Sequence, residues 1–157
     1  MMDTAGREIV VDRLLDALPA AVFRAWTTPE EIVKWWGPNG FTTTILEMDV
    51  RPGGVWRYVM HGPDGRNYPN RVVFLEVDPP SRLVFKHTPE AGDEPVHHTS
   101  IVTFDRVDAQ TRVTMRGIFD SAEALEYVVK TYGAAEGAAQ TMDRLVAFVA
   151  ASAARRS

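Results

Sequence analysis

The 157-residue chain is 45% hydrophobic and 24% charged, which predicts one globular domain over residues 1–157. Its net charge of −4 argues against nucleic acid as a partner, and the absence of cysteine excludes disulfides, thiolate nucleophiles and thiolate metal sites. We expect a cytoplasmic protein without a membrane span, because residues 1–8 lack secretory-signal features and the longest apolar stretch, Leu145–Ala151, is far shorter than ~18 residues. Residues 1–6 and 154–157 are expected to be disordered.

The first 38 residues predict one strand and two short helices. A strand is expected over 8–16, where β-branched residues are frequent, and Pro19 ends it because proline cannot continue a ladder. Pro19 also suits the first turn of a helix. A second helix is predicted over Thr28–Pro38, with Thr28 as its cap and Glu31 three residues later, as in a capping box.

Residues 41–118 predict an antiparallel meander, because apolar residues alternate with a period of two and turn sequences recur at hairpin intervals. With the first strand this makes a sheet of about seven strands. We expect the loop from Thr88 to Pro95 to be mobile. The predicted strands are 43–51, 54–61, 67–77, 82–88, 98–106 and 111–118.

The alternation gives the meander one aromatic-rich inner face. Its predicted members are Leu46, Met48 and Val50, then Trp56, Tyr58 and Met60, then Leu83, Phe85 and His87, then Val102 and Phe104, and finally Val113 and Met115. Trp35 and Trp36 are consecutive on a helix and lie about 100° apart, so only one of them is expected to enter the core.

After Phe119 the pattern becomes helical, first in a short segment that Asp120 and Glu123 can cap and then in a long helix from about residue 135. The long helix has an apolar stripe that can cover the inner face, and Gln140, Asp143 and Arg144 are placed on its other side. In the first two turns this stripe carries only small residues, alanine and glycine. Small residues opposite large ones allow either a filled core or a hollow lined by aromatic residues, if the twisted sheet curves away.

Three motifs resemble those of a known family: Trp35-Trp36-Gly37-Pro38 with Phe41, Met48–Gly54 with Trp56, and Pro80–Phe85. With the order of elements, they make the chain similar to the START/Bet v 1-like (SRPBCC) superfamily, and especially to bacterial proteins named after the C-terminal domain of the activator of the heat-shock-protein 90 ATPase. The resemblance implies an α+β helix-grip fold: a curved antiparallel sheet wrapped around a long C-terminal helix, two short helices after the first strand, and a deep cavity between sheet and helix. It supplies no catalytic residues.

One position departs from this family pattern. Relatives commonly have tryptophan after the Glu-Gly pair of the last helix, whereas Ala138 follows Glu136-Gly137 here. We hypothesise that Ala138 enlarges the cavity at that end.

The four histidines do not have metal-site spacing, and we expect no metal and no cofactor. His97 and His98 are adjacent in a predicted strand and point to opposite faces, so they cannot bind one metal ion together. Surface positions are the alternative expected for these histidines. His87 is a weak candidate for a catalytic acid or base, because it shares a face with Phe85, but no sequence neighbour is placed to orient it. The alternative is a histidine in the wall of the cavity. Asp49 and Glu76 are interpreted as ion-pair partners of Arg51 and Arg71.

Three functions remain open from the sequence: binding of a small apolar or aromatic molecule such as a lipid, a protein-interaction module, and a cyclase-, dehydratase- or hydrolase-like enzyme that uses the same cavity. The chain is expected to be a monomer or homodimer. The predicted ligand-binding residues are Trp35, Phe41, Met48, Trp56, Tyr58, Met60, Tyr68, Phe85, His87, Phe104, Met115, Ala138 and Met142.

Overall fold

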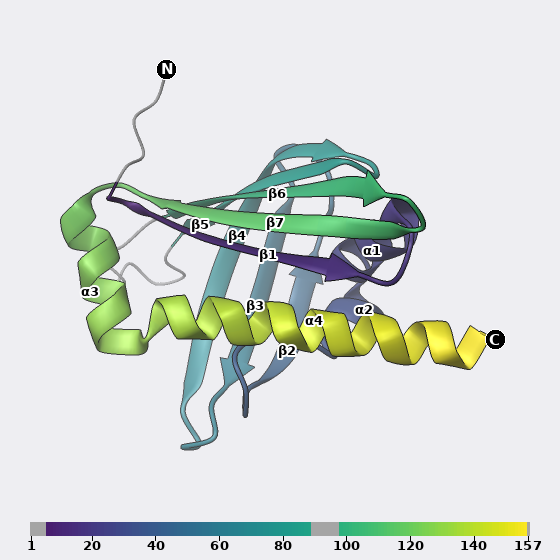
Figure 1. Cartoon of the computed structure of the whole chain (residues 1–157). Coiled ribbons are helices and arrows are strands. Elements are labelled where there is room, and N and C mark those ends of the chain that lie inside the picture. Colours follow the sequence, from purple (N-terminus) through teal and green to yellow (C-terminus); the bar gives the residue numbers. More distant parts are fainter. Residues whose placement is uncertain (1–5, 89–97, 157) are drawn as a thin grey trace.

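The computed structural model describes residues 6–88 and 98–156 and shows a curved antiparallel sheet with a long helix beside it (Figure 1). The strands are β1 (Glu8–Leu15), β2 (Thr42–Met48), β3 (Val55–His61), β4 (Asn67–Asp78), β5 (Arg82–Thr88), β6 (His98–Val107) and β7 (Gln110–Phe119). The helices are α1 (Pro19–Thr27), α2 (Pro29–Ile32), α3 (Ala122–Tyr132) and α4 (Ala134–Arg156). Residues 1–5, 89–95 and 157, where we expected disorder or mobility, lie outside the described residues.

The sheet order is β1-β7-β6-β5-β4-β3-β2, so consecutive strands of the meander are neighbours and β1 closes the far edge against β7. The predicted α+β helix-grip architecture is therefore confirmed. Strand boundaries agree with the expected ones within about three residues, because glycine and proline turns separate the strands.

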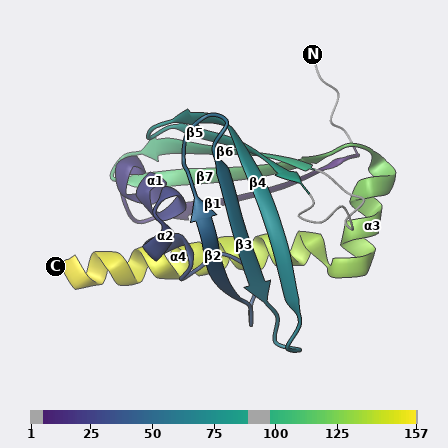
Figure 2. The same ribbon diagram turned by 180° about the vertical axis from the view of Figure 1, so that it is seen from behind.

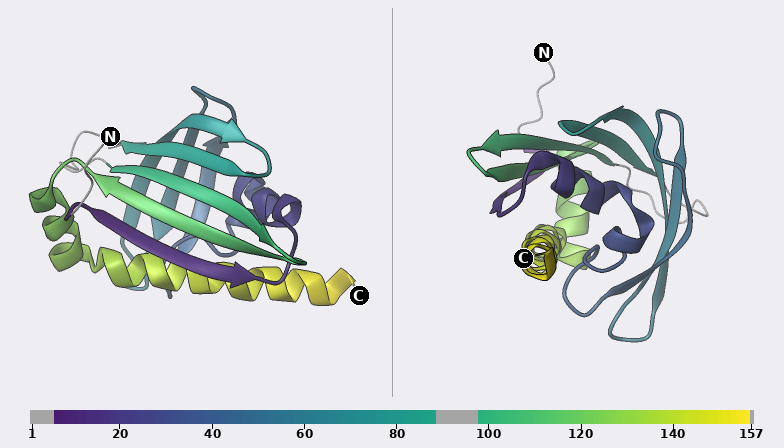
Figure 3. Two further views of the ribbon diagram at one scale, coloured as in Figure 1. Left: turned by 45° about the horizontal axis from the view of Figure 1, so that its top comes forward. Right: turned by 90° about the vertical axis from the view of Figure 1, so that its right-hand side faces the viewer.

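The helices lie on the concave side of the sheet, and they occupy different parts of it (Figures 2 and 3). The α1–α2 pair fills one end, α3 lies at the opposite end, and α4 runs from α3 past α2, packed along β1. The C-terminal helix was predicted to cover the inner face. It does so only in part, since α1 and α2 provide the rest of the cover.

Aromatic side chains from α1, from the residues that follow α2 and from the strands form the centre of the core. The rings of Trp26 and Trp35 have centroids 4.8 Å apart, and those of Trp56 and Tyr58 lie 4.5 Å apart. Trp35 is fully buried and donates from Nε1 to the carbonyl oxygen of Ala25 at 3.1 Å, whereas Trp36 is only partly buried. One tryptophan of the pair thus enters the core, as predicted.

Three local predictions were wrong. The second helix was expected over Thr28–Pro38, but α2 ends at Ile32 and turns follow it. Leu46 is 55% exposed, because a β-bulge between Ile45 and Glu47 shifts the alternation of β2 and turns Ile45 inward instead. Thr28 does stand at the N-cap of α2, but its side chain makes no capping hydrogen bond. Glu31 accepts a hydrogen bond from Nε of Arg24 at 3.2 Å instead of completing a capping box.

Candidate functional site

Burial changes along the concave face of the sheet. Toward α1 and α2 the inner side chains are sealed, as Phe23 of α1 lies against Phe104 with ring centroids 5.2 Å apart. Toward α3 most inner side chains of the same strands keep part of their surface accessible, although Phe119 at the end of β7 and Ser100 of β6 are buried. The sealed set includes Val72, Phe74, Leu83, Phe85, Val102, Phe104 and Val113.

The facing helix shows the same change along its length. In the half of α4 near α3, Ala134, Gly137 and Ala138 are partly buried. In the other half Met142, Leu145 and Val149 belong to the core. Both layers are therefore sealed at the α1–α2 end and accessible at the α3 end.

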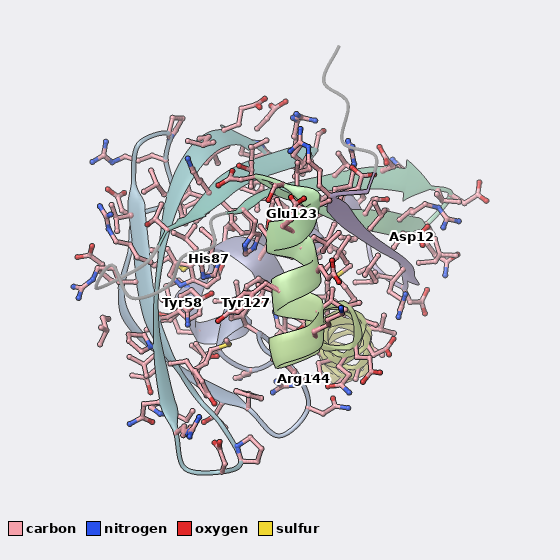
Figure 4. The ribbon with its side chains drawn as sticks, turned by 90° about the vertical axis from the view of Figure 1, so that its left-hand side faces the viewer. Asp12, Tyr58, His87, Glu123, Tyr127 and Arg144 are labelled. Atoms are coloured by element: carbon pink, nitrogen blue, oxygen red, sulfur yellow. The ribbon has the colours of Figure 1, made fainter. Side chains whose placement is uncertain are left out.

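We use the name α3-side surface for the partly buried inner-face residues at that end. In Figure 4 the ring of Tyr127 extends from α3 toward the part of the sheet that holds Tyr58 and His87. Tyr127 is 41% exposed, whereas Tyr58 is 1% exposed and forms part of the floor. The α3-side surface consists of Phe41, Met60, Tyr68, Asn70, His87, His98, Met115 and Ala138.

His87, at the end of β5, is held by Asn70 of β4. Its Nε2 atom lies 2.7 Å from Oδ1 of Asn70, and the Asn70 amide nitrogen donates to the carbonyl oxygen of Tyr68 at 2.8 Å. The ring of Tyr58 stands almost perpendicular to the His87 ring, with centroids 6.3 Å apart. These contacts fix the position of the imidazole.

His98, directly opposite His87 on β6, stacks on it with centroids 4.9 Å apart, and Phe119 stacks on the other side of His98 at 4.8 Å. Burial and, to a smaller extent, the neighbouring His98 together lower the pKa of His87 to about 3. Burial likewise lowers the pKa of His98 to about 4, although Asp120 opposes this change. Both rings are neutral at physiological pH, so His87 is available as a hydrogen-bond partner but not as a proton donor in acid catalysis.

Tyr58 is also uncharged under all ordinary conditions. Burial raises its phenol pKa well above the usual range, and the indole N–H of Trp36 only partly offsets that rise. The indole N–H groups of Trp26 and Trp56 are buried without a hydrogen-bond partner among the described residues. The centre of the concave face therefore offers rings and neutral polar groups.

The structure divides the predicted ligand-binding residues into three groups. Trp35, Trp56, Tyr58, Phe85, Phe104 and Met142 are buried in the core. Phe41, Met60, Tyr68, His87, Met115 and Ala138 belong to the α3-side surface. Met48 is partly buried, packs against the edge of the core and lies beside the turn between β2 and β3. Whether any of them contacts a ligand stays a prediction.

Two of the recesses among the described residues lie at different places in the fold. One, of about 330 Å³, is lined by residues of the β2–β3 connection, Met48 and Asp49 among them. The other, of about 40 Å³, lies between α1, α2 and the C-terminal part of α4. The hollow expected between sheet and α4 is neither of these two, and the indoles of Trp26, Trp35 and Trp36 occupy much of the space assigned to it.

Sequence reasoning missed Asn70 and misplaced His98 and Arg144. His98 was expected at the surface, yet the alternation that places Phe104 and Val102 inside also places Ser100 and His98 there. Arg144 was assigned to the polar side of its helix. Its guanidinium instead donates to the carbonyl oxygens of Gly37 at 2.8 Å and Pro38 at 3.1 Å.

The remaining ionic contacts lie on the surface. Asp49 pairs with Arg51 at 2.7 Å, as predicted, but Glu76 pairs with Arg82 and not with Arg71. Among residues 6–88 and 98–156, no group of three or more acidic, histidine or cysteine side chains is arranged to hold a metal ion. No helix in that part of the chain is long and apolar enough to cross a membrane.

The fold and this aromatic concave face define a helix-grip protein of the START/Bet v 1-like class. The family model described as "Activator of Hsp90 ATPase homolog 1-like protein" matches residues 16–150, and the chain belongs to this family. No curated protein matches the sequence.

Solved structures from other bacteria have the same fold. A Nitrosomonas europaea protein is 26% identical over 98% of this chain and 99% of its own, with a TM-score of 0.85. A Mycobacterium smegmatis protein is 30% identical over 94% and 93% of the two chains, with a TM-score of 0.81. An Arthrobacter aurescens protein, 24% identical over 96% of this chain and 90% of its own, has a TM-score of 0.86 and shows the fold alone.

Proposed function

We propose that the protein binds a small apolar or aromatic molecule at the α3-side surface. The observation that carries this proposal is the contrast between the two halves of one concave face. The inner side chains are sealed by α1 and α2 at one end, while the same strands keep aromatic and methionine side chains partly accessible at the other end. An accessible concave apolar surface with a few fixed polar groups is the usual form of a small-molecule site.

The residues of this surface support an apolar ligand. Met60 and Met115 have flexible, polarisable side chains that adapt to different shapes. Phe41 and Tyr68 contact each other with ring centroids 5.9 Å apart and add flat aromatic area. Burial of apolar area contributes about 25 cal/mol per Å², so contact with these side chains is the main source of binding free energy.

The small side chain of Ala138 gives a direct test. N-phenyl-1-naphthylamine is an uncharged probe whose fluorescence increases in apolar surroundings. We expect it to bind the native protein, and Ala138→Trp to weaken its binding about tenfold or more, because the indole would occupy the space between α4 and the sheet.

Ala147→Trp is the matched control, since Ala147 is an exposed residue of the same helix. This variant should bind the probe as the native protein does. Circular dichroism would show that both variants are folded. Absence of probe binding to the native protein, or equal binding by Ala138→Trp, would contradict the proposal.

A further inference from the structure

The amide of Asn70 determines which nitrogen of His87 carries the proton. A carbonyl oxygen only accepts hydrogen bonds, so the group 2.8 Å from the Tyr68 oxygen must be the NH₂ of Asn70. The amide oxygen of Asn70 is then the group that faces Nε2 of His87 at 2.7 Å. Because that oxygen only accepts, Nε2 of His87 bears the hydrogen.

A neutral imidazole with its hydrogen on Nε2 has a lone pair on Nδ1. No group within residues 6–88 and 98–156 donates a hydrogen bond to Nδ1 of His87. The imidazole is fixed by Asn70 and by stacking on His98, so this acceptor has a defined position at the α3-side surface.

The groups around this acceptor are mostly uncharged. The ring of His87 meets the rings of Tyr58 and His98, and Phe119 lies behind His98. The charged groups at this end include Arg7, which donates to the carbonyl oxygen of Phe119, the carboxylate of Asp120, and Glu123 and Lys130 of α3. A ligand carboxylate placed beside these rings would lose its hydration without gaining a cation directly opposite it.

We propose that the site selects uncharged molecules with an apolar body and a hydroxyl group, such as phenols and hydrophobic alcohols, whose O–H donates to Nδ1 of His87. This inference rests on the proposed function, because it specifies the ligand of the same surface. It predicts discrimination against ligands of similar shape that lack a donor or that carry a carboxylate.

The low basicity of His87 supports this selectivity. Burial and the adjacent His98 hold its pKa near 3, so the protonated ring that could pair with a carboxylate is scarce at neutral pH. A neutral hydroxyl needs no change in protonation. A fatty-acid headgroup would therefore be accepted poorly.

Three naphthalene derivatives of similar size test the proposal by isothermal titration calorimetry at neutral pH. The probes are 2-naphthol, which donates a hydrogen bond, 2-methoxynaphthalene, which does not, and 2-naphthoate, which is an anion. We expect 2-naphthol to bind about tenfold more tightly than 2-methoxynaphthalene, because a factor of about ten corresponds to the contribution of one hydrogen bond. We also expect 2-naphthol to bind more tightly than 2-naphthoate.

His87→Phe should remove the preference for 2-naphthol over 2-methoxynaphthalene while keeping the affinity for the methoxy compound. His61→Phe is the matched control, because His61 lies on the opposite face of the sheet and bonds Thr44 and Asn67. This control should keep the full preference. If His87→Phe does not fold, the same question can be tested with ¹⁵N NMR spectra of the histidine rings in the native protein. The Nδ1 signal of His87 should then shift on addition of 2-naphthol.

The possible results separate the two proposals. If none of the three compounds binds, the proposed function fails. If they bind equally, if 2-naphthoate binds most tightly, if His87→Phe keeps the preference, or if the Nδ1 signal does not respond, the selectivity proposal is overturned. In each of these four cases the binding function itself stands.

Discussion

At the scale of single residues, the stacked pair His87 and His98 makes stability depend on pH. Both histidines have lower pKa values in the folded protein, about 3 and about 4, than the 6.5 of a free imidazole. Between the folded-state pKa values and 6.5, the unfolded chain therefore binds more protons than the folded protein does. Stability must then fall as the pH falls below 6.5. Above that pH the contribution of the pair is complete.

We predict that the free energy of unfolding falls by about 2 kcal/mol between about pH 7.5 and about pH 5. This loss is smaller than the one expected for two fully buried histidine rings, because both rings are partly accessible to solvent. Urea denaturation at the two pH values measures it. His98→Phe should lose clearly less stability over this interval, because one of the two titrating rings is absent. An equal pH response in the native protein and in His98→Phe would contradict the prediction.

Residue positions were predictable where one strand alone decides them. The alternation in β3 places Trp56, Tyr58 and Met60 inside, and the structure agrees. The contact between His87 and Asn70 was not predictable, because it depends on the register between β4 and β5. The predicted orientation of Leu46 was wrong for a related reason, because the residues around it do not predict the β-bulge.

At the scale of elements, α4 holds the segment that follows α2. Arg144 donates to the carbonyl oxygens of Gly37 and Pro38, and Gln140 accepts from the backbone N–H of Asn39 at 3.1 Å. At Gly137 a Cβ atom would lie 3.3 Å from the ring of Pro38, so glycine permits this close approach. These contacts connect α4 to the segment that carries Trp36.

We predict that Arg144→Met lowers the free energy of unfolding by about 2 kcal/mol, because buried carbonyl oxygens lose charged hydrogen-bond donors. Chemical denaturation measures this change. Arg112→Met is the control, since the Arg112–Asp12 pair is exposed and should contribute less than about 1 kcal/mol. Equal losses in the two variants would show that Arg144 does not connect these elements.

The elements themselves were largely predictable from turn residues and period. Ser121, rather than the expected Asp120, caps α3 by accepting from the N–H of Ala124 at 3.0 Å. Gly133 ends α3 with φ of 64°, close to the predicted break. Which residue caps a helix depends on the atomic geometry of the helix end. Capping propensities alone do not distinguish between neighbouring residues such as Asp120 and Ser121.

At the scale of the whole molecule, the concave face is divided into a sealed half and an accessible half. This division follows from where α1 and α2 lie against the sheet, and no single segment encodes that placement. The small residues at the start of α4 allowed either tight packing or a hollow at that end, and the sequence did not decide between them. The indoles that close the other end became evident only from the assembled fold.

The most direct test of the central claim is NMR of the protein with ¹³C-labelled methionine methyl groups in the presence of 2-naphthol. Binding at the α3-side surface predicts intermolecular nuclear Overhauser effects from the ligand to the methyl groups of Met60 and Met115. No such effect is expected at Met48, which lines the recess beside β2 and β3. Effects at Met48 alone, or bound ligand without effects at Met60 and Met115, would contradict the account.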